Sequence, residues 1–173
     1  MDPAHLPDGA SAPVGPDQTA ATATVTSSTM APNLSPSDPV TAHLAALSGR
    51  DDRDLGAGLA TGVSLTLVQT GEVILGREAV TVIFAELHRQ AFVAQTTVSS
   101  RTVQGTHTVV EATFAGRHVA EFAGISPAGT AVSFPYVLAY ETATEGTGET
   151  EIVAIRAYLP FEELIRQLRG GGP

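Results

Sequence analysis

Residues 107–141 read HTVVEATFAGRHVAEFAGISPAGTAVSFPYVLAYE, and the fold depends on this stretch. Side chains alternate in size with period 2 on both sides of residues 125–129, a pattern typical of strands. Ser126 and Pro127 favour a turn between them, and Gly129 can adopt a positive φ. We therefore predict two long strands joined as a hairpin. The even positions form a large, aromatic face: Phe114, His118, Phe122, Val132, Phe134, Tyr136, Leu138 and Tyr140.

The position of the turn also predicts which residues face each other. A symmetric hairpin closed at residues 125–129 places His118 opposite Tyr136. Residues paired across a hairpin share a face, with Cβ atoms ~5 Å apart. We therefore expect an imidazole beside a phenol on the aromatic face. A bulge near Gly116 would change which earlier residues share that face, and it would turn Glu111 inward.

Composition limits the classes of function. The 173 residues suffice for one domain with a core. A net charge of −9 argues against a nucleic-acid partner and an anionic membrane surface. The chain has no cysteine, its five histidines lack ligand spacing, and no apolar run approaches the ~20 residues of a membrane span. We expect a cytoplasmic protein with no metal and no cofactor.

The chain divides into a tail and a domain. Residues 1–37 hold six of the eleven prolines and no arginine, a composition typical of disorder. Asp38 and Pro39 then form a helix N-terminus, so we place the domain at residues 38–173.

The remaining pattern predicts an α+β domain. Strands that follow helices favour a single bent antiparallel sheet around a long helix. His43 and His88 are expected at helix flanks, and Asp51, Asp52 and Asp54 in a solvated turn rather than an acid–base pair. The expected elements are helices at residues 38–48, 54–60, 77–92 and 160–170, and strands at residues 63–75 (with a turn at Gly71), 95–104, the hairpin and 152–159.

Several segments together resemble the SnoaL-like polyketide cyclases of the nuclear-transport-factor-2-like superfamily, over about residues 38–169. They are Gly76-Arg77-Glu78-Ala79-Val80, Gly116-x-His118, Glu121-Phe122-x-Gly124, Pro127-x-Gly129, Arg156-x-Tyr158 and Leu164-x-x-Gln167-Leu168. The resemblance implies a cone-shaped α+β fold with an apolar pocket, an apolar small-molecule substrate, and a homodimer formed through the outer face of the sheet. The superfamily includes cyclases, ketosteroid isomerases, epoxide hydrolases, dehydratases and binding modules, so the fold alone does not give the function.

Most family carboxylates are absent from the matching positions. The position that looks like the isomerase general base holds Leu67, and the oxyanion-binding position holds Tyr136, whose phenol can still donate a hydrogen bond. The positions where cyclases and epoxide hydrolases often have an aspartate hold Ile155, Ala157, Leu159 and Pro160.

Three residues remain as catalytic candidates. His118 can shuttle a proton, since an ordinary histidine pKa is about 6.5, or it can simply bridge the hairpin. Tyr136 can bind an oxyanion or be a core tyrosine. Glu111 becomes an acid or base only if the bulge turns it inward. The expected lining of the pocket, which is otherwise ordinary core, is Leu67, Phe114, Phe134, Leu138, Tyr140, Ile155 and Leu159.

These observations favour a cofactor-independent cyclase or isomerase of secondary metabolism, such as antibiotic biosynthesis. It would hold an apolar polyketide-like molecule in a near-attack shape, which lowers the barrier without strong acid–base groups. One alternative is a non-catalytic small-molecule-binding or scaffold module. A third is an epoxide hydrolase or dehydratase, which depends on an inward Glu111.

Overall fold

The computed structural model describes residues 38–49, 54–144, 146 and 148–170. The expected disordered tail at residues 1–37 lies outside the described residues, as do Asp51 and Asp52. No helix among the described residues is long and apolar enough to cross a membrane.

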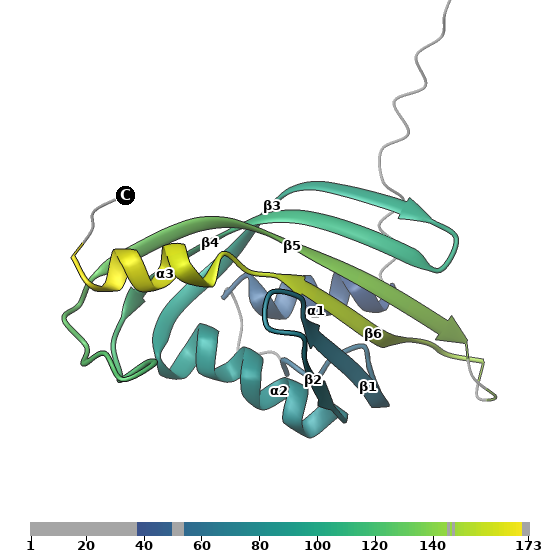
Figure 1. Cartoon of the computed structure of the whole chain (residues 1–173). Coiled ribbons are helices and arrows are strands. Elements are labelled where there is room, and N and C mark those ends of the chain that lie inside the picture. The colour runs from purple at the N-terminus through teal and green to yellow at the C-terminus, as the bar shows by residue number, and fades with distance from the viewer. Residues whose placement is uncertain (1–37, 50–53, 145, 147, 171–173) are drawn as a thin grey trace, which may run out of the picture. The chain divides into compact units, whose positions relative to one another are not determined.

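The described chain forms an α+β fold, as the sequence predicts. One six-stranded sheet has the order β2-β1-β6-β5-β4-β3, and its long strands arch over α1 and α2 (Figure 1). The elements are α1 Pro39–Leu47, β1 Leu59–Leu67, β2 Glu72–Leu75, α2 Arg77–Ala85, the π-helical turn η1 Glu86–Gln90, β3 Phe92–Gln104, β4 His107–His118, β5 Ala131–Thr144, β6 Thr150–Tyr158 and α3 Phe161–Leu168.

The sheet is mixed, so the expectation of a purely antiparallel sheet is wrong. β1 and β6 run parallel, with Leu65 opposite Ile155, whereas the other neighbours are antiparallel. The two strands lie at opposite ends of the domain sequence, so no hairpin connection constrains their direction.

The predicted hairpin register is also wrong. Tyr136 pairs with Ala112, not with His118, and Phe114 pairs with Phe134. The pairing stops where the His118 N–H donates to the Thr130 carbonyl (2.9 Å), well before the expected turn. After His118 the chain leaves the sheet, because the Val119 and Ala120 N–H groups donate to the Ala91 carbonyl at the end of the long helix.

The two faces of the hairpin nevertheless agree with the prediction. The even-numbered residues from Val110 to Tyr140 are buried, except at Gly116 and in the connection between β4 and β5, residues 119–130. The irregularity in the β3–β4 pair lies between Val98 and Ser100 of β3, not near Gly116. Glu111 therefore stays on the outer face of the sheet.

The predicted short helix at residues 54–60 does not form. The Asp54 carboxylate accepts from the Gly56 N–H (2.8 Å), which makes a turn, and β1 begins at Leu59. Gly58 has φ +76°, and a Cβ there would lie 2.5 Å from the Pro39 carbonyl oxygen. The close approach of this turn to α1 therefore requires glycine.

The helix after Gly76 turns two different sides toward the interior. Val80, Phe84 and His88 are buried, whereas Ile83 and Leu87 are only half-buried. The flank position predicted for His88 is therefore wrong, because this residue lies four after Phe84 on the core side.

His43 was likewise expected at a helix flank, and it is fully buried in the structure. Its ring packs edge-on against Phe84 (ring centroids 4.9 Å apart) and Tyr140 (5.9 Å).

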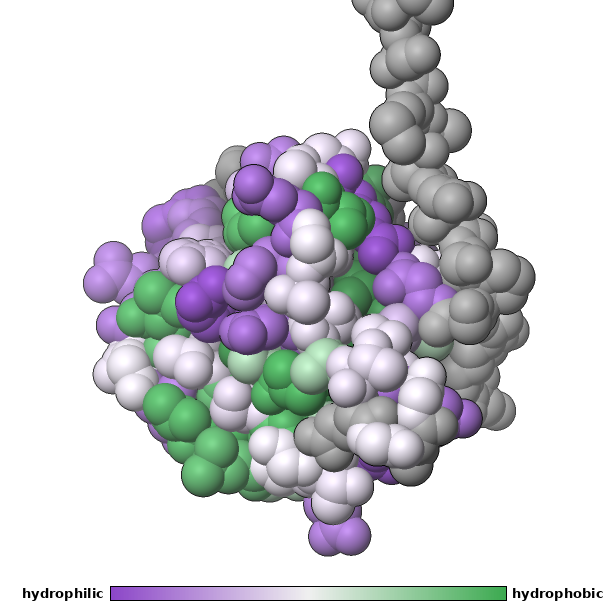
Figure 2. Space-filling model, turned by 90° about the vertical axis from the view of Figure 1, so that its right-hand side faces the viewer, coloured by the Kyte–Doolittle hydropathy of each residue, from purple (hydrophilic) through white to green (hydrophobic). Residues whose placement is uncertain are grey.

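On the surface, hydrophobic residues of one face lie in separate patches between polar ones (Figure 2).

Candidate functional site

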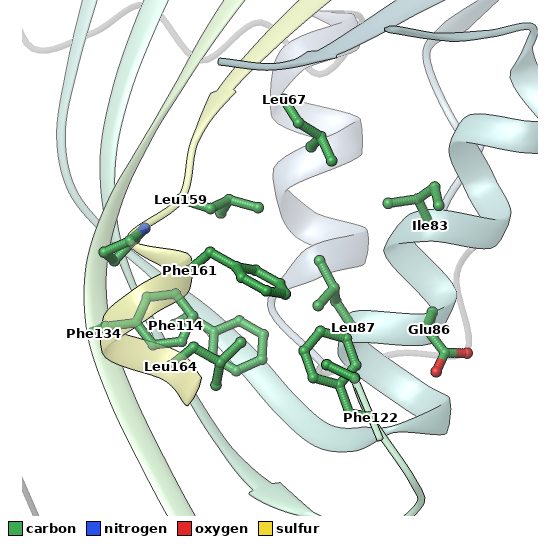
Figure 3. A pocket seen from close by; sticks show the side chains of 12 residues that line it. Leu67, Ile83, Glu86, Leu87, Phe114, Phe122, Phe134, Leu159, Phe161 and Leu164 are labelled. Atoms are coloured by element: carbon green, nitrogen blue, oxygen red, sulfur yellow. The ribbon is translucent and has the colours of Figure 1, made fainter. Parts of the chain in front are cut away.

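An apolar cavity of about 310 Å³ lies between the sheet, the long helix and α3 (Figure 3). Eleven of its twelve lining residues are apolar, and Glu86 is the ionisable one. The lining residues are Leu67, Ile83, Glu86, Leu87, Phe114, Phe122, Ala123, Phe134, Leu159, Pro160, Phe161 and Leu164.

Aromatic rings build the sheet side and the rim of this cavity. The rings of Phe114 and Phe134 stack with centroids 4.9 Å apart and planes 14° apart. Phe122 of the β4–β5 connection faces Phe161 of α3, with centroids 5.8 Å apart. Flat aromatic walls favour a flat apolar ligand.

The loop at the rim holds Phe122 in place by a tight turn. Phe122 and Ile125 exchange two backbone hydrogen bonds of 3.1 and 2.9 Å. Both residues between them have positive φ, 50° at Ala123 and 74° at Gly124, as a type I′ turn requires. A positive φ is strained for alanine, so this segment of the cavity wall stores local strain.

α3 closes the cavity, and its Gln167 side chain forms hydrogen bonds with the sheet. Gln167 Oε1 accepts from the Ser133 N–H (2.8 Å), and Gln167 Nε2 donates to the Ser133 carbonyl (2.8 Å). β6 pairs with β5 only from Val137 onward, so at Ser133 this amide takes the place of a strand partner. The same Nε2 also donates to Glu163 (2.8 Å).

The structure divides the expected pocket residues into two groups. Leu67, Phe114, Phe134 and Leu159 line the cavity. Leu138, Tyr140 and Ile155 are fully buried core residues on the same sheet, but they are not among those lining it.

Tyr136 lies behind the cavity wall in a buried chain of hydrogen bonds. His88 Nδ1 lies 3.1 Å from the Phe84 carbonyl, which can only accept, so Nδ1 carries the proton. Nε2 therefore accepts from Thr96 Oγ1 (3.2 Å), and Thr96 Oγ1 accepts from the Tyr136 hydroxyl (2.6 Å). The Tyr136 proton thus points to Thr96 rather than to the cavity.

Burial determines the charge states in this chain. It lowers the pKa of His88 to about 4 and raises the pKa of Tyr136 to about 12, so both are neutral at pH 7. Burial, followed by the nearby His88, lowers the pKa of His43 to about 4 as well.

His118 also lies behind the wall. It is 1% exposed, and its ring stacks on Phe92 with centroids 5.2 Å apart. Phe92 in turn contacts Phe114 (5.7 Å) and Phe122 (5.2 Å), which line the cavity. His118 is not among the lining residues and does not adjoin Tyr136.

Glu111 lies outside the core. Its side chain is exposed, and its Oε2 accepts from Ser100 Oγ (2.9 Å). Glu111 therefore lies on the outer face, as strict alternation predicts, and no bulge near Gly116 turns it inward.

The sequence analysis overlooked two polar residues of this region, Glu86 and His88. The sequence places His88 at a helix flank, and it assigns no role to Glu86. Ile83, Glu86 and Leu87 fall at i, i+3 and i+4 on the cavity side, so a carboxylate within an apolar helical face was the available signal. The π-helical turn was not predictable, although such turns are frequent at functional sites.

No cluster of three histidine, aspartate or glutamate side chains that could hold a metal occurs in the described part of the chain. No protein-family model matches the chain, and a search of curated proteins finds no match.

Solved structures do match. A protein from Jannaschia Sp. CCS1, described as a SnoaL-like polyketide cyclase, aligns with a TM-score of 0.64 and 22% identity over 80% of this chain and 96% of its own. A protein from Catenulispora acidiphila DSM 44928 with a ketosteroid isomerase-like fold aligns at 0.56 and 22%, over 76% and 92%. An LEH-like epoxide hydrolase of M. tuberculosis aligns at 0.56 and 18%, over 77% and 88%.

These alignments span most of both chains, and they confirm the fold that the sequence segments predicted. Proteins of this fold carry out different reactions, so the likeness concerns architecture. The chain has the fold shared by SnoaL-like polyketide cyclases and ketosteroid isomerase-like proteins.

Proposed function

We propose that the protein is a cofactor-independent cyclase or isomerase that acts on an apolar, polyketide-like intermediate of secondary metabolism in the cytoplasm. The observation that carries this proposal is the cavity itself, about 310 Å³ in volume with eleven apolar lining residues and one carboxylate. Its volume is at the lower end of ordinary small-molecule sites, ~300–1,000 Å³, which suits a molecule of a few rings.

The wall supplies shape rather than many polar groups. Stacked Phe114 and Phe134 can hold a flexible chain of carbonyl and methylene groups in a folded arrangement with its reacting atoms close together. Such preorganisation supplies ~7–11 kcal/mol in favourable cases.

His118 and Tyr136 remain part of this proposal in a different role. Neither lines the cavity, but His118 supports Phe92 and Tyr136 lies beside Phe134, with ring centroids 6.5 Å apart. We assign both as positioning residues that hold the aromatic wall.

The proposal is tested in the producing organism by deleting the gene and comparing small molecules by mass spectrometry. Ring closure and isomerisation conserve mass, so the accumulated compound should have the mass of the lost product. A difference of one water would instead indicate hydrolysis or dehydration. An unchanged profile would contradict a catalytic role.

A non-catalytic binding module is the second candidate. Three apolar lining residues favour it: Leu67, Leu159 and Pro160. The family resemblance matches Leu67 to the isomerase general base, and it matches Leu159 and Pro160 to positions where cyclases and epoxide hydrolases can have an aspartate. Such a module would bind an apolar molecule and release it unchanged. The epoxide hydrolase or dehydratase alternative loses its support, because Glu111 is exposed on the outer face.

A homodimer formed through the outer face of the sheet belongs to the same proposal. Val93, Val109 and Tyr158 expose 66%, 42% and 41% of their surface on the side of the sheet turned away from the helices. Sedimentation should give twice the chain mass, and Val109→Arg should give the single mass. A single mass for the unmodified protein at all concentrations would contradict the dimer.

A further inference from the structure

We propose that Phe122 and Phe161 form an aromatic gate at the mouth of the cavity, and that the width of the opening between their rings determines which molecules enter. This inference rests on the proposed function of the cavity as a small-molecule site. It assigns the two residues that control access and selectivity there.

The exposed lining residues locate the mouth of the cavity. Two of the twelve are exposed, Ala123 of the β4–β5 connection and Phe161 at the start of α3. Phe161 exposes 43% of its surface, and it also lines two open grooves along α3. The remaining lining residues are buried or half-buried. The cavity therefore reaches the surface between the β4–β5 connection and the start of α3.

Two rings lie across this mouth. The rings of Phe122 and Phe161 are in contact, with centroids 5.8 Å apart and planes 53° apart, and both side chains line the cavity (Figure 3). Phe122 also packs edge-on against the fully buried Phe92, with centroids 5.2 Å apart. The contact between the two rings contains no hydrogen bond, so it can open without leaving a polar group unpaired.

The β4–β5 connection is held at its two ends. At one end the N–H groups of residues 119 and 120 donate to the Ala91 carbonyl (2.8 and 3.2 Å). At the other end the His118 N–H donates to the Thr130 carbonyl (2.9 Å). Both ends are thus fixed to the long helix and to the sheet.

Between these ends the turn is bonded to itself. The two backbone hydrogen bonds that the described structure shows for residues 121–128 join Phe122 and Ile125 to each other. Within the turn, the φ of 50° at Ala123 is strained for a residue with a Cβ, which lowers the cost of leaving this conformation. α3, by contrast, is hydrogen-bonded to the sheet through Gln167. Phe122 is therefore the moving side of the gate and Phe161 the fixed side.

A gate has a kinetic signature that a wall does not have. Removing a gate ring speeds both entry and release of the ligand, so the dissociation constant changes much less than either rate. Removing a wall contact weakens the bound state, so it speeds release and leaves the association rate unchanged. The two rates together therefore distinguish a gate residue from a residue that only contacts the ligand.

The probe is naphthalene, whose fluorescence reports binding in a stopped-flow experiment against a protein that has no tryptophan. Phe161→Ala should raise the association and release rates by ~10-fold each, with a dissociation constant within ~3-fold of the unmodified value. Phe122→Leu, which keeps an apolar side chain against Phe92, should raise both rates in the same way. Leu67→Ala, in the sheet wall, is the matched control and should speed release alone.

Selectivity is tested with adamantane, a rounded hydrocarbon with the same number of carbon atoms as naphthalene. Its entry is measured by competition with naphthalene. The flat molecule should enter the unmodified protein ~10-fold faster, because it passes through a narrower opening. Phe161→Ala should remove most of this difference.

The outcomes separate this inference from the proposed function. Unchanged association rates in both Phe161→Ala and Phe122→Leu would overturn the gate, and so would equal entry of the two hydrocarbons into the unmodified protein. In either case the cavity would remain a ligand site. If neither hydrocarbon binds to the unmodified protein or to the variants, both proposals fail. Gated binding together with an unchanged metabolite profile in the deletion strain would support the gate and contradict catalysis alone.

Discussion

Tyr136 is the residue whose role differs most from its sequence-based interpretation. Its hydroxyl donates to Thr96, which donates to His88. The phenol proton is therefore used in a buried hydrogen bond rather than in a contact with a bound molecule. We expect Tyr136→Phe to lower the free energy of unfolding by ~1 kcal/mol, the usual net value of one hydrogen bond. Denaturant unfolding measures this change, and Tyr158→Phe, at an exposed tyrosine, should change it by less than ~0.5 kcal/mol.

Thr96→Val provides the partner for a double-mutant cycle with Tyr136→Phe. Because the two hydroxyls bond each other, their effects should not add. Additive losses would contradict the hydrogen-bond chain. A large loss of ligand affinity in Tyr136→Phe, with an unchanged free energy of unfolding, would show instead that this hydroxyl contacts the bound molecule.

A substitution at Gly116 tests how closely the strands β3 and β4 pack against each other. A Cβ at Gly116 would lie 2.6 Å from the Cβ of Ala94, its partner in the neighbouring strand. Gly116→Ala should therefore lower the free energy of unfolding by ~1–3 kcal/mol, through strain in the strand pair. Thermal or denaturant unfolding of this variant provides the measurement.

The matched control for that substitution is Gly62→Ala in β1, where a Cβ would meet nothing within 4 Å. It should be neutral or stabilising by up to ~1 kcal/mol. Adding Ala94→Gly to Gly116→Ala should recover most of the loss. Equal effects at Gly62 and Gly116 would refute the close approach of the strands.

The attachment of α3 is the second prediction at the scale of elements. Gln167→Ala removes the acceptor of the Ser133 N–H and the donor to the Ser133 carbonyl. We expect a loss of ~1–3 kcal/mol and faster hydrogen exchange at the Ser133 amide and across α3. Gln104→Ala, at an exposed position, is the control. Unchanged hydrogen exchange at the Ser133 amide would show that the Gln167 side chain does not hold α3 on the sheet.

Elements also show what the sequence could reveal about the hairpin. The buried face of β4 and β5 was predictable because side-chain alternation does not depend on register. The register was not, because the Val119 and Ala120 N–H groups bond the distant Ala91 carbonyl and end the pairing early. The turn signal at Ser126 and Pro127 lies inside a longer connection, so it could not locate the strand ends.

The same reasoning applies to the candidate site. Leu67, Phe114 and Phe134 could be placed at the cavity from strand faces and from the family resemblance. For Glu86 the sequence offers only its spacing with Ile83 and Leu87, and a single glutamate on a helix is also compatible with an ordinary surface position. Its position becomes part of a cavity wall through the tertiary structure, in which α3 and the 119–130 connection, joined by the Phe122–Phe161 contact, supply other walls of the same cavity.

At the scale of the whole molecule, the buried histidines His43 and His88 predict how stability depends on pH. Burial lowers the folded-state pKa of His43 and of His88 to about 4, whereas the unfolded value is 6.5. Below pH 6.5 the unfolded chain therefore binds more protons than the folded one. The free energy of unfolding should fall from pH 6.5 to about 4, with a slope of up to ~1.4 kcal/mol per pH unit for each histidine.

From about one pH unit above 6.5 both residues are almost entirely neutral in both states, so they contribute almost no slope there. Urea unfolding between pH 4 and 8 measures the effect. His43→Phe should reduce the slope below pH 6.5 by about half, because one of two equivalent titrations is removed. An unchanged slope in both His43→Phe and His88→Phe would mean that neither histidine is held neutral by the fold.

The central claim is that an apolar cavity folds and rearranges its substrate without a cofactor. The most direct measurement incubates the purified protein with the compound that accumulates in the deletion strain and follows it by liquid chromatography and mass spectrometry. We expect conversion, with no added cofactor, to a compound of identical mass and different retention time. Leu87→Trp, which fills the cavity from its helix wall, should abolish it. No conversion, a product that differs by one water, or full activity in Leu87→Trp would contradict the claim.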